Sequence, residues 1–396
     1  MSALLGWLLG AVVLLACLPL SVFLAQVLLA CLPAAWPAPP PKRPRPKLAV
    51  LVPAHDESST IQATLAGIRP QLRDGDRLLV VADNCTDDTA ALARAGGAEV
   101  LERRNGQLRG KGYALDFGIR HLAADAPEVL VIVDADCLVG EGGIERLALR
   151  CVDAGRPAQA LYLMHAPEGA GLKVRIAEFA WRVKNLVRPR GWARLGLPCQ
   201  LMGTGMAFVW RDLALVDLAS GHLVEDLKMG LDFCRHGKPP LFCPEALVSS
   251  RFPGSDEGLK AQRTRWEHGH LGVLLGDAPR LLAEALAQGN GKLLAMTLDL
   301  LVPPLALLSL ALAGLFGLCW LVFLLGGALA PALLASVALV ALAGAVVLAW
   351  SRFGRGLIAF SVLLYAPFYA LRKIPLYLGF LIRRQVDWVR SKRDDG

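Results

Sequence analysis

A short apolar run in this chain, residues 131–133, ends in two aspartates, Asp134 and Asp136, which are separated by a single residue. At the end of a strand this spacing lets both carboxylates face one cation, and carboxylate oxygens suit Mg²⁺ or Mn²⁺. A metal held there could neutralise the charge of a departing diphosphate. Aspartate is also common in solvated turns, so the pair needs partners before it predicts a metal site.

Acidic residues follow two other segments that read as strands. The first segment is followed by PAHDE, which contains Pro53, His55 and Glu57, and the second is followed by Asp83. Asp83 could accept a hydrogen bond from a base N–H, although capping of the next helix is an equally simple use for it. Since the carboxyl ends of parallel strands meet at one rim, we expect these residues to lie close together.

Two further groups carry charge at the starts of predicted helices. Lys111 stands in RGKG, where a basic side chain can meet a phosphate. Glu225 and Asp226 follow the segment with Gly203 and Thr204 and could supply a general base. The alternatives are an ordinary surface lysine and an acid pair that only caps its helix.

A third group, QRTRW, contains Gln262, Arg265 and Trp266. Gln262 and Trp266 are four residues apart, so on a helix they share a face. Tryptophan can stack on a sugar ring and arginine can pair with a phosphate. Both residue types also anchor amphipathic helices at membrane interfaces, which is the alternative reading of this group.

Strand-like and helix-like segments alternate from residue 47 onward, with short connections. The expected strands are residues 47–52, 77–81, 98–102 and 128–134, and the expected helices are residues 58–70, 86–97 and 110–124. This alternation predicts an α/β fold with a mostly parallel sheet and helices on both faces. In such sheets ligands bind at the carboxyl ends of the strands, where Asp134 and Asp136 stand.

Apolar segments at both ends of the chain are long enough to cross a bilayer. Residues 3–32 and 297–382 are almost entirely apolar, whereas the region between them reads as an ordinary globular domain. Pro367, Arg372 and Pro375 interrupt the last segment, so that part could be re-entrant or lie at the interface.

The charge and cysteine content narrow the class of protein. The net charge of +8 comes from Lys and Arg that cluster beside the apolar segments, which marks the cytoplasmic side of a membrane rather than nucleic-acid binding. The nine cysteines are scattered and form no CxxC pair. Neither a disulfide framework nor a zinc site is therefore expected.

Taken in order, these motifs resemble those of the membrane-integrated family-2 glycosyltransferases, the branch with cellulose, chitin and hyaluronan synthases and ceramide glucosyltransferase. The resemblance covers about residues 47–272 and depends on DAD, ED and QxxRW at these distances. It implies a GT-A-like (Rossmann-like) glycosyltransferase domain inserted between transmembrane helices. The domains would be an anchor at 1–34, a Pro-rich basic linker at 35–46, a GT-A catalytic domain at 47–256, amphipathic interface helices at 257–292, transmembrane or re-entrant segments at 293–383 and a basic tail at 384–396.

The resemblance also implies a role for each motif residue. His55, Glu57 and Asp83 would line a uridine pocket together with Pro53, and Lys111 would lie near the diphosphate. Asp134 would contact the nucleotide, and Asp136 would ligate Mg²⁺ or Mn²⁺ with Asp134. Asp226 would be the base beside Glu225, Gly203 and Thr204 would line the acceptor entrance, and Gln262, Arg265 and Trp266 would close over the diphosphate and acceptor. A single base without a protein nucleophile predicts inversion at the anomeric carbon. The chain departs from the family pattern at Asp56, Ala82 and Val224, which weakens any inference about the sugar.

The expected partners are a UDP-sugar with glucose or N-acetylglucosamine, a glycan or lipid-linked acceptor, and membrane lipids, with no nucleic acid. We expect a multi-pass protein of the bacterial cytoplasmic membrane, with the catalytic domain in the cytoplasm, that acts in polysaccharide biosynthesis. Single-sugar transfer to a lipid is the alternative, because about four apolar segments are few for a polymer channel. A partner subunit or a homo-oligomer could also supply the additional segments that a polymer channel needs. A nucleotidyltransferase would need a glycine-rich loop after the first strand, which PAHDESST is not, and a catalytically dead nucleotide sensor would not need every motif.

Overall fold

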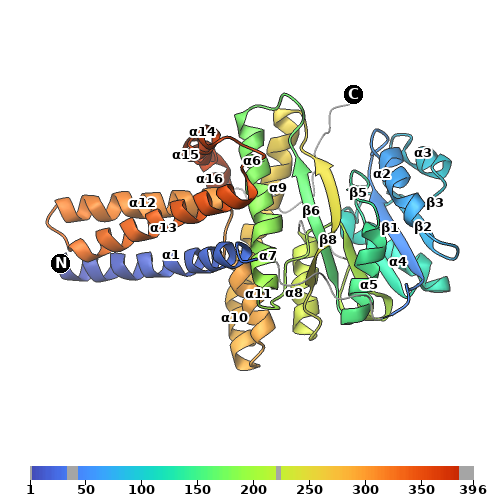
Figure 1. Ribbon diagram of the computed structural model, residues 1–396, viewed down its shortest axis with the longest axis horizontal. Coiled ribbons are helices and arrows are strands. Elements are labelled where there is room, and N and C mark those ends of the chain that lie inside the picture. Colours follow the sequence, from blue (N-terminus) through green and yellow to red (C-terminus); the bar gives the residue numbers. More distant parts are fainter. Residues whose placement is uncertain (1, 34–42, 220–223, 383–396) are drawn as a thin grey trace.

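The computed structural model describes residues 2–33, 43–219 and 224–382 of the chain (Figure 1). An α/β domain built on one mixed sheet adjoins a bundle of long apolar helices. Most of the predicted linker (35–46) and the whole predicted tail (384–396) lie outside the described residues.

The sheet has eight strands in the order β3-β2-β1-β4-β7-β6-β8-β5. Their bounds are β1 Leu48–Ala54, β2 Arg77–Asp83, β3 Glu99–Arg103, β4 Val129–Ile132, β5 Leu138–Val139, β6 Ala158–His165, β7 Met206–Val209 and β8 Leu241–Arg251. The first four strands are parallel neighbours, as predicted. The antiparallel insertion of β7 between β4 and β6 was not predicted, because four residues are too few to show a strand period.

Helices cover both faces of the sheet, again as predicted. Their bounds are α1 Ser2–Ala30, α2 Ile61–Ile68, α3 Thr89–Ala95, α4 Lys111–Leu122, α5 Gly143–Ala154, α6 Leu172–Arg182, α7 Arg188–Ala193, α8 Glu225–Arg235, α9 Asp256–Gly276, α10 Ala278–Ala287, α11 Gly291–Leu300, α12 Leu305–Leu324, α13 Leu329–Phe353, α14 Phe360–Leu363, α15 Ala366–Leu371 and α16 Ile374–Ile382. Alternate residues of β1 point to opposite faces of the sheet, and each set packs against a different layer of helices. Val50 and Val52 pack with α2 and α5, whereas Ala49 and Leu51 pack with α4 and α8, so β1 is apolar on both faces.

Three helices of the described part are long and apolar enough to cross a membrane, namely α1, α12 and α13. They pack side by side and extend away from the sheet (Figure 1). The interrupted segment after α13 forms the short helices α14, α15 and α16. Pro367 and Pro375 stand in the first turns of α15 and α16, where proline is tolerated because those N–H groups have no helical partner.

A buried polar network joins the first apolar helix to the α/β domain. The Arg188 guanidinium of α7 donates to Gln26 Oε1 of α1 at 3.0 Å and to Asp299 Oδ1 of α11 at 2.8 Å. Gln26 Nε2 donates to the same Asp299 oxygen at 2.5 Å. Each member satisfies the others, so a buried charge pair is tolerated at a junction of three helices.

The contact between α1 and α7 also depends on Gly191. A Cβ at this position would lie 2.1 Å from the backbone carbonyl oxygen of Gln26. Because backbone cannot rotate away as a side chain can, Gly191→Ala should force the helices apart, at a cost of about 1–3 kcal/mol.

We therefore expect Gly191→Ala to lower the apparent Tm of the detergent-purified protein. Gly276→Ala is the matched control, since it also lies in a helix but a Cβ there meets nothing within 4 Å. The control should keep or slightly raise the Tm, because alanine favours helix over glycine by about 1 kcal/mol. Equal Tm values for the two variants would contradict this account of the junction.

Candidate active site

Lys111 brings together several charged groups beyond the carboxyl end of β4. Its ammonium group forms an ion pair with Asp134 and donates to the carbonyl oxygen of Gly203 at 2.7 Å. Glu225 Oε1 lies 4.0 Å from the same nitrogen. The first turns of α4 and α8 and the segment after β4 thus meet at one cation.

The loop that contains Gly203 and Thr204 packs against this cluster. Gly203 has a φ of +88°, which glycine adopts without strain. A Cβ there would lie 3.4 Å from Asp226 Oδ2 and 3.5 Å from Lys111 Nζ. The Asp134 backbone N–H donates to Thr204 Oγ1 at 3.0 Å, so the loop is fixed directly to the end of β4.

Burial decides the protonation of the acid pair at the start of α8. Desolvation, followed by the neighbouring Asp226 charge, raises the pKa of Glu225 to about 7. Desolvation also raises the pKa of Asp226, against the opposing effect of the Lys111 charge. Burial alone would lower the pKa of Lys111, but the Asp134 and Glu225 carboxylates outweigh it and raise that pKa. The cluster therefore holds a charged lysine beside two carboxyl groups that take up protons readily.

Asp134, Asp136 and Cys137 form a candidate metal site. One ligand atom from each lies within 4.8 Å of the others. Burial raises the pKa of the Cys137 thiol to about 12, so it stays a neutral thiol and donates to Asp136 Oδ1 at 3.4 Å. The available donors are therefore carboxylate oxygens, which fit Mg²⁺ or Mn²⁺ better than zinc.

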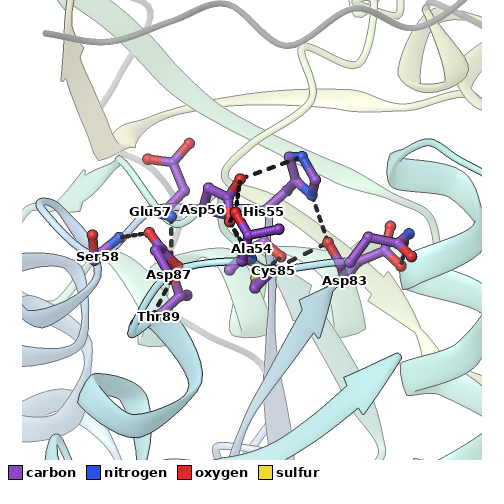
Figure 2. A network of polar contacts seen from close by, with 11 residues as sticks. Ala54, His55, Asp56, Glu57, Ser58, Asp83, Cys85, Asp87 and Thr89 are labelled. Carbon is purple, nitrogen blue, oxygen red and sulfur yellow. Dashed lines mark hydrogen bonds and ion pairs between the residues drawn. The ribbon is translucent and has the colours of Figure 1, made fainter. Parts of the chain in front are cut away.

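Figure 2 shows the residues that follow β1 and β2. His55 Nδ1 lies 2.6 Å from the backbone oxygen of Asp83, so these two predicted residues are in contact. The Asp83 carboxylate accepts from Arg103 Nη1 at 2.5 Å, and both side chains are buried. Glu57 accepts from Thr60 at 2.9 Å and its carboxylate points away from Asp83 in Figure 2. Pro53 is within β1, next to this group.

The QRTRW residues lie on α9. Gln262 is buried, and its Oε1 has no hydrogen-bond partner within the described part of the chain. The Trp266 ring packs against Trp181 with centroids 4.7 Å apart, and Arg265 is half-buried. Lys184 Nζ lies over the Trp181 ring, 5.3 Å from its centroid.

Lys184 links α9 to the acid cluster. Its pKa is lowered by desolvation, while the charge of Asp226 is the first of those that oppose the shift. The predicted residues thus fall into three groups: the Lys111 cluster, the His55–Asp83 pair, and the α9 residues connected through Trp181 and Lys184.

A cavity of about 680 Å³ is lined by residues of α6, α9, α12, α13, α14 and α15, with Trp266 among them. Its size is within the usual range for ligand sites. Most of its lining is aliphatic or aromatic, with Lys184, Arg263 and Glu267 among the charged exceptions. It therefore joins the candidate site to the apolar helices.

Sequence reasoning missed Arg103, Trp181, Lys184 and Gln159. Gln159 is buried and donates to the backbone oxygen of Thr204 at 2.9 Å, so it holds the loop below Lys111. None of these residues belongs to a short motif, and only the fold brings them to the site. Trp181 and Lys184, three residues apart, did carry a signal, since that spacing places them on one face of a helix.

The sequence profile described as "Glycosyltransferase like family 2" matches residues 44–269, more than half of the chain. The chain belongs to this family. Among curated proteins, this family-2 member is 37% identical over 98 residues to a glucosyl-3-phosphoglycerate synthase of Mycobacterium tuberculosis. That match covers 23% of this chain and 29% of the relative. An uncharacterized glycosyltransferase of Mycobacterium bovis is 37% identical over 101 residues, or 25% of this chain and 41% of that protein.

Among solved structures, a mannosyltransferase from Pyrobaculum calidifontis in complex with GDP-mannose and Mn²⁺ matches 95% of this chain and 100% of its own, with a TM-score of 0.56 and 18% identity. At that identity the match speaks for the fold alone. The predicted GT-A-like α/β fold is thereby confirmed. The narrower resemblance to cellulose, chitin and hyaluronan synthases stays a prediction.

Glu225→Gln should flatten the dependence of thermal stability on pH. Folding raises the pKa of Glu225 from its ordinary 4.5 to about 7, so the folded state holds this proton more tightly than the unfolded state. The resulting stabilisation is complete below the unfolded pKa and is lost as the pH rises through the folded pKa, a change of at most about 3 kcal/mol.

The measurement is the apparent Tm between about pH 5 and pH 8 in the presence of a chelator. The wild type should lose stability across this range and Glu225→Gln should lose less. Glu284→Gln is the control, because hydrogen bonding to Arg235 lowers the pKa of Glu284 and its effect has the opposite sign. Parallel curves for wild type and Glu225→Gln would refute the assignment.

Proposed function

We propose that this protein is a membrane-embedded, inverting hexosyltransferase that moves a sugar from a UDP-sugar to a lipid acceptor. The observation that carries the proposal is the apolar cavity whose lining includes Trp266 of α9 and residues of the apolar helices α12 and α13. An acceptor with a hydrocarbon part would gain from burial there, whereas the many hydroxyls of a polysaccharide would lose their hydration.

The donor would bind at the rim formed by the ends of β1, β2 and β4. His55, Asp83 and Glu57 would surround the base and ribose, and Lys111 would lie near the diphosphate. Asp134 and Asp136 would hold Mg²⁺ or Mn²⁺, which supplies charge neutralisation for the diphosphate. The carboxylate donor set described above supports this placement.

Asp226 would accept the proton of the acceptor hydroxyl as that oxygen bonds to the anomeric carbon. Its raised pKa makes the carboxylate a better proton acceptor than an exposed aspartate. Glu225 would keep the local charge balanced with Lys111, and Arg265 would stabilise the diphosphate as it departs. Attack opposite the leaving group by one nucleophile gives inversion.

The arrangement of the helices supports a cytoplasmic catalytic domain. Arg190 Nε donates to the Ala30 oxygen at the end of α1 at 3.1 Å, and Arg182 Nη1 donates to the Phe353 oxygen at the end of α13 at 3.4 Å. Both helices thus meet the α/β domain at the same side as Arg352 and Arg355. Basic residues at that boundary favour the cytoplasmic face, in a bacterium the inner membrane.

Asp226→Asn should abolish transfer but preserve donor binding. Loss of a general base lowers kcat by about 10²- to 10⁴-fold, whereas the amide keeps the shape of the site. Release of nucleoside diphosphate would be measured for a panel of UDP- and GDP-sugars with Mg²⁺ or Mn²⁺, with UDP binding measured by calorimetry. Asp232→Asn is the control, since Asp232 lies on α8 and pairs with Lys228 at 3.0 Å. An active Asp226→Asn variant would overturn the role of this residue.

The size of the product decides between single transfer and polymerisation. With radiolabelled donor and a membrane lipid extract, we expect a labelled lipid with one added sugar that partitions into organic solvent. A ladder of longer, water-soluble products would instead establish polysaccharide synthesis, which the apolar lining of the cavity does not favour.

A further inference from the structure

Two hydrogen-bond donors in the cavity wall have no acceptor. Trp181 Nε1 and Arg263 Nη2 are both buried and lack a hydrogen-bond partner among the residues that the structure describes. Both residues line the cavity. A buried donor left unpaired costs roughly 1–3 kcal/mol, so a ligand oxygen that accepts a hydrogen bond from either donor would stabilise this part of the cavity.

The charges at this end of the cavity do not cancel. Arg188 is balanced by Asp299 and Lys373 by Glu267. Lys184 and Arg263, by contrast, have no carboxylate within ion-pair distance in the described ranges.

Two features favour a net positive charge around Lys184 and Arg263. Lys184 and Arg263 lie over aromatic rings, those of Trp181 at 5.3 Å and Tyr369 at 5.6 Å, and such contacts stabilise a cation without neutralising it. Burial lowers the pKa of the neighbouring His270 to about 3, so this ring stays neutral. The cavity wall therefore carries two cations without a partner carboxylate and two buried donors that lack a hydrogen-bond partner among the described residues.

We propose that this cavity binds an anionic phospholipid with a hydroxylated head group, and that this lipid is the sugar acceptor. Its phosphodiester would accept hydrogen bonds from Arg263 and Trp181 and lie beside Lys184, while its acyl part fills the apolar length of the cavity. The charge complementarity selects this class over a neutral lipid, which would leave both donors and both charges unpaired. This inference rests on the proposed function.

The transfer to this acceptor forms one bond, breaks one bond and moves one proton. The head-group hydroxyl oxygen forms a bond to the anomeric carbon, and the bond from that carbon to the diphosphate oxygen breaks with its electron pair retained by UDP. The hydroxyl proton passes to the Asp226 carboxylate. The head-group hydroxyl of a phosphodiester held by Lys184 would have to reach Asp226 for this step to occur.

The test compares phosphatidylglycerol with diacylglycerol of the same acyl chains as acceptors for the full-length protein in detergent micelles. We expect phosphatidylglycerol to have a KM lower by about 10-fold or more, since a hydrogen bond to a charged group contributes at least that factor. Trp181→Phe, which keeps the ring and removes the donor, and Arg263→Leu should each reduce this preference. Arg263→Lys should keep part of it.

Arg355→Leu is the matched control, because Arg355 also lies over a tryptophan ring, at 5.5 Å from Trp350, but is not part of the cavity wall. It should keep the full preference. Equal use of the two lipids by the wild type, or an unchanged preference in both Trp181→Phe and Arg263→Leu, would overturn the inference.

UDP binding and lipid-independent UDP release, measured alongside, separate this inference from the proposed function. If diacylglycerol is glycosylated as well as phosphatidylglycerol, only the head-group inference fails. If no UDP-sugar binds or turns over, the proposed function fails with it.

Discussion

The site depends on one electrostatic constraint, which is that Asp134, Glu225 and Asp226 share a poorly solvated space and repel one another. Lys111 relieves this repulsion, since it pairs with Asp134 and lies 4.0 Å from Glu225. Even so, the pKa of Glu225 rises to about 7. The neighbouring elements are arranged around this cluster, because each carboxylate needs either the lysine or a proton to remain buried.

The strand order explains how distant residues reach that cluster. Strand β7 runs antiparallel to β4 with Ile132 opposite Met206. The residues before β7 therefore lie beside those that follow β4, which places Gly203 and Thr204 against Asp134. A parallel β7 would have placed this loop at the other end of the strands, beside the residues that precede β4. The antiparallel strand thus places the loop with Gly203 and Thr204 against Asp134 and Lys111.

The sequence was sufficient for the parts of the molecule that repeat a simple pattern. The first four strands, the helices between them and the apolar spans follow from periodicity and length. Lys111, Asp134 and the acid pair were identified because charged residues at element ends are conspicuous. Arg103, Gln159 and Trp181 were not, since their roles depend on contacts between segments far apart in the chain. The pairing of Asp83 with Arg103 in particular changes what Asp83 can offer a ligand, and no spacing rule predicts it.

The helix around Lys184 shows a second limit of sequence reasoning. Residues Val183–Val187 form a π-helical turn between α6 and α7, a local widening that is frequent at functional sites. Lys184 lies within this turn and over the Trp181 ring, and the sequence did not predict the turn. Arg188 is fixed by the network with α1 and α11, so the turn is held between the membrane junction and the cavity.

The family match ends at residue 269, whereas the cavity wall continues through α12, α13 and α15 to Lys373. In the proposed function, the donor side of the site would therefore be built from the shared domain, and most of the acceptor side from segments beyond it. This division has a physical basis, since a nucleotide and a divalent metal impose the same geometry on any member, but acceptors differ in size and polarity. An acceptor with an apolar part would need walls that remain dry, and the apolar helices α12 and α13 would supply them at little cost in solvation. Trp181, Lys184 and Arg263, which line the cavity, would then lie where the shared chemistry and the chain-specific acceptor site meet.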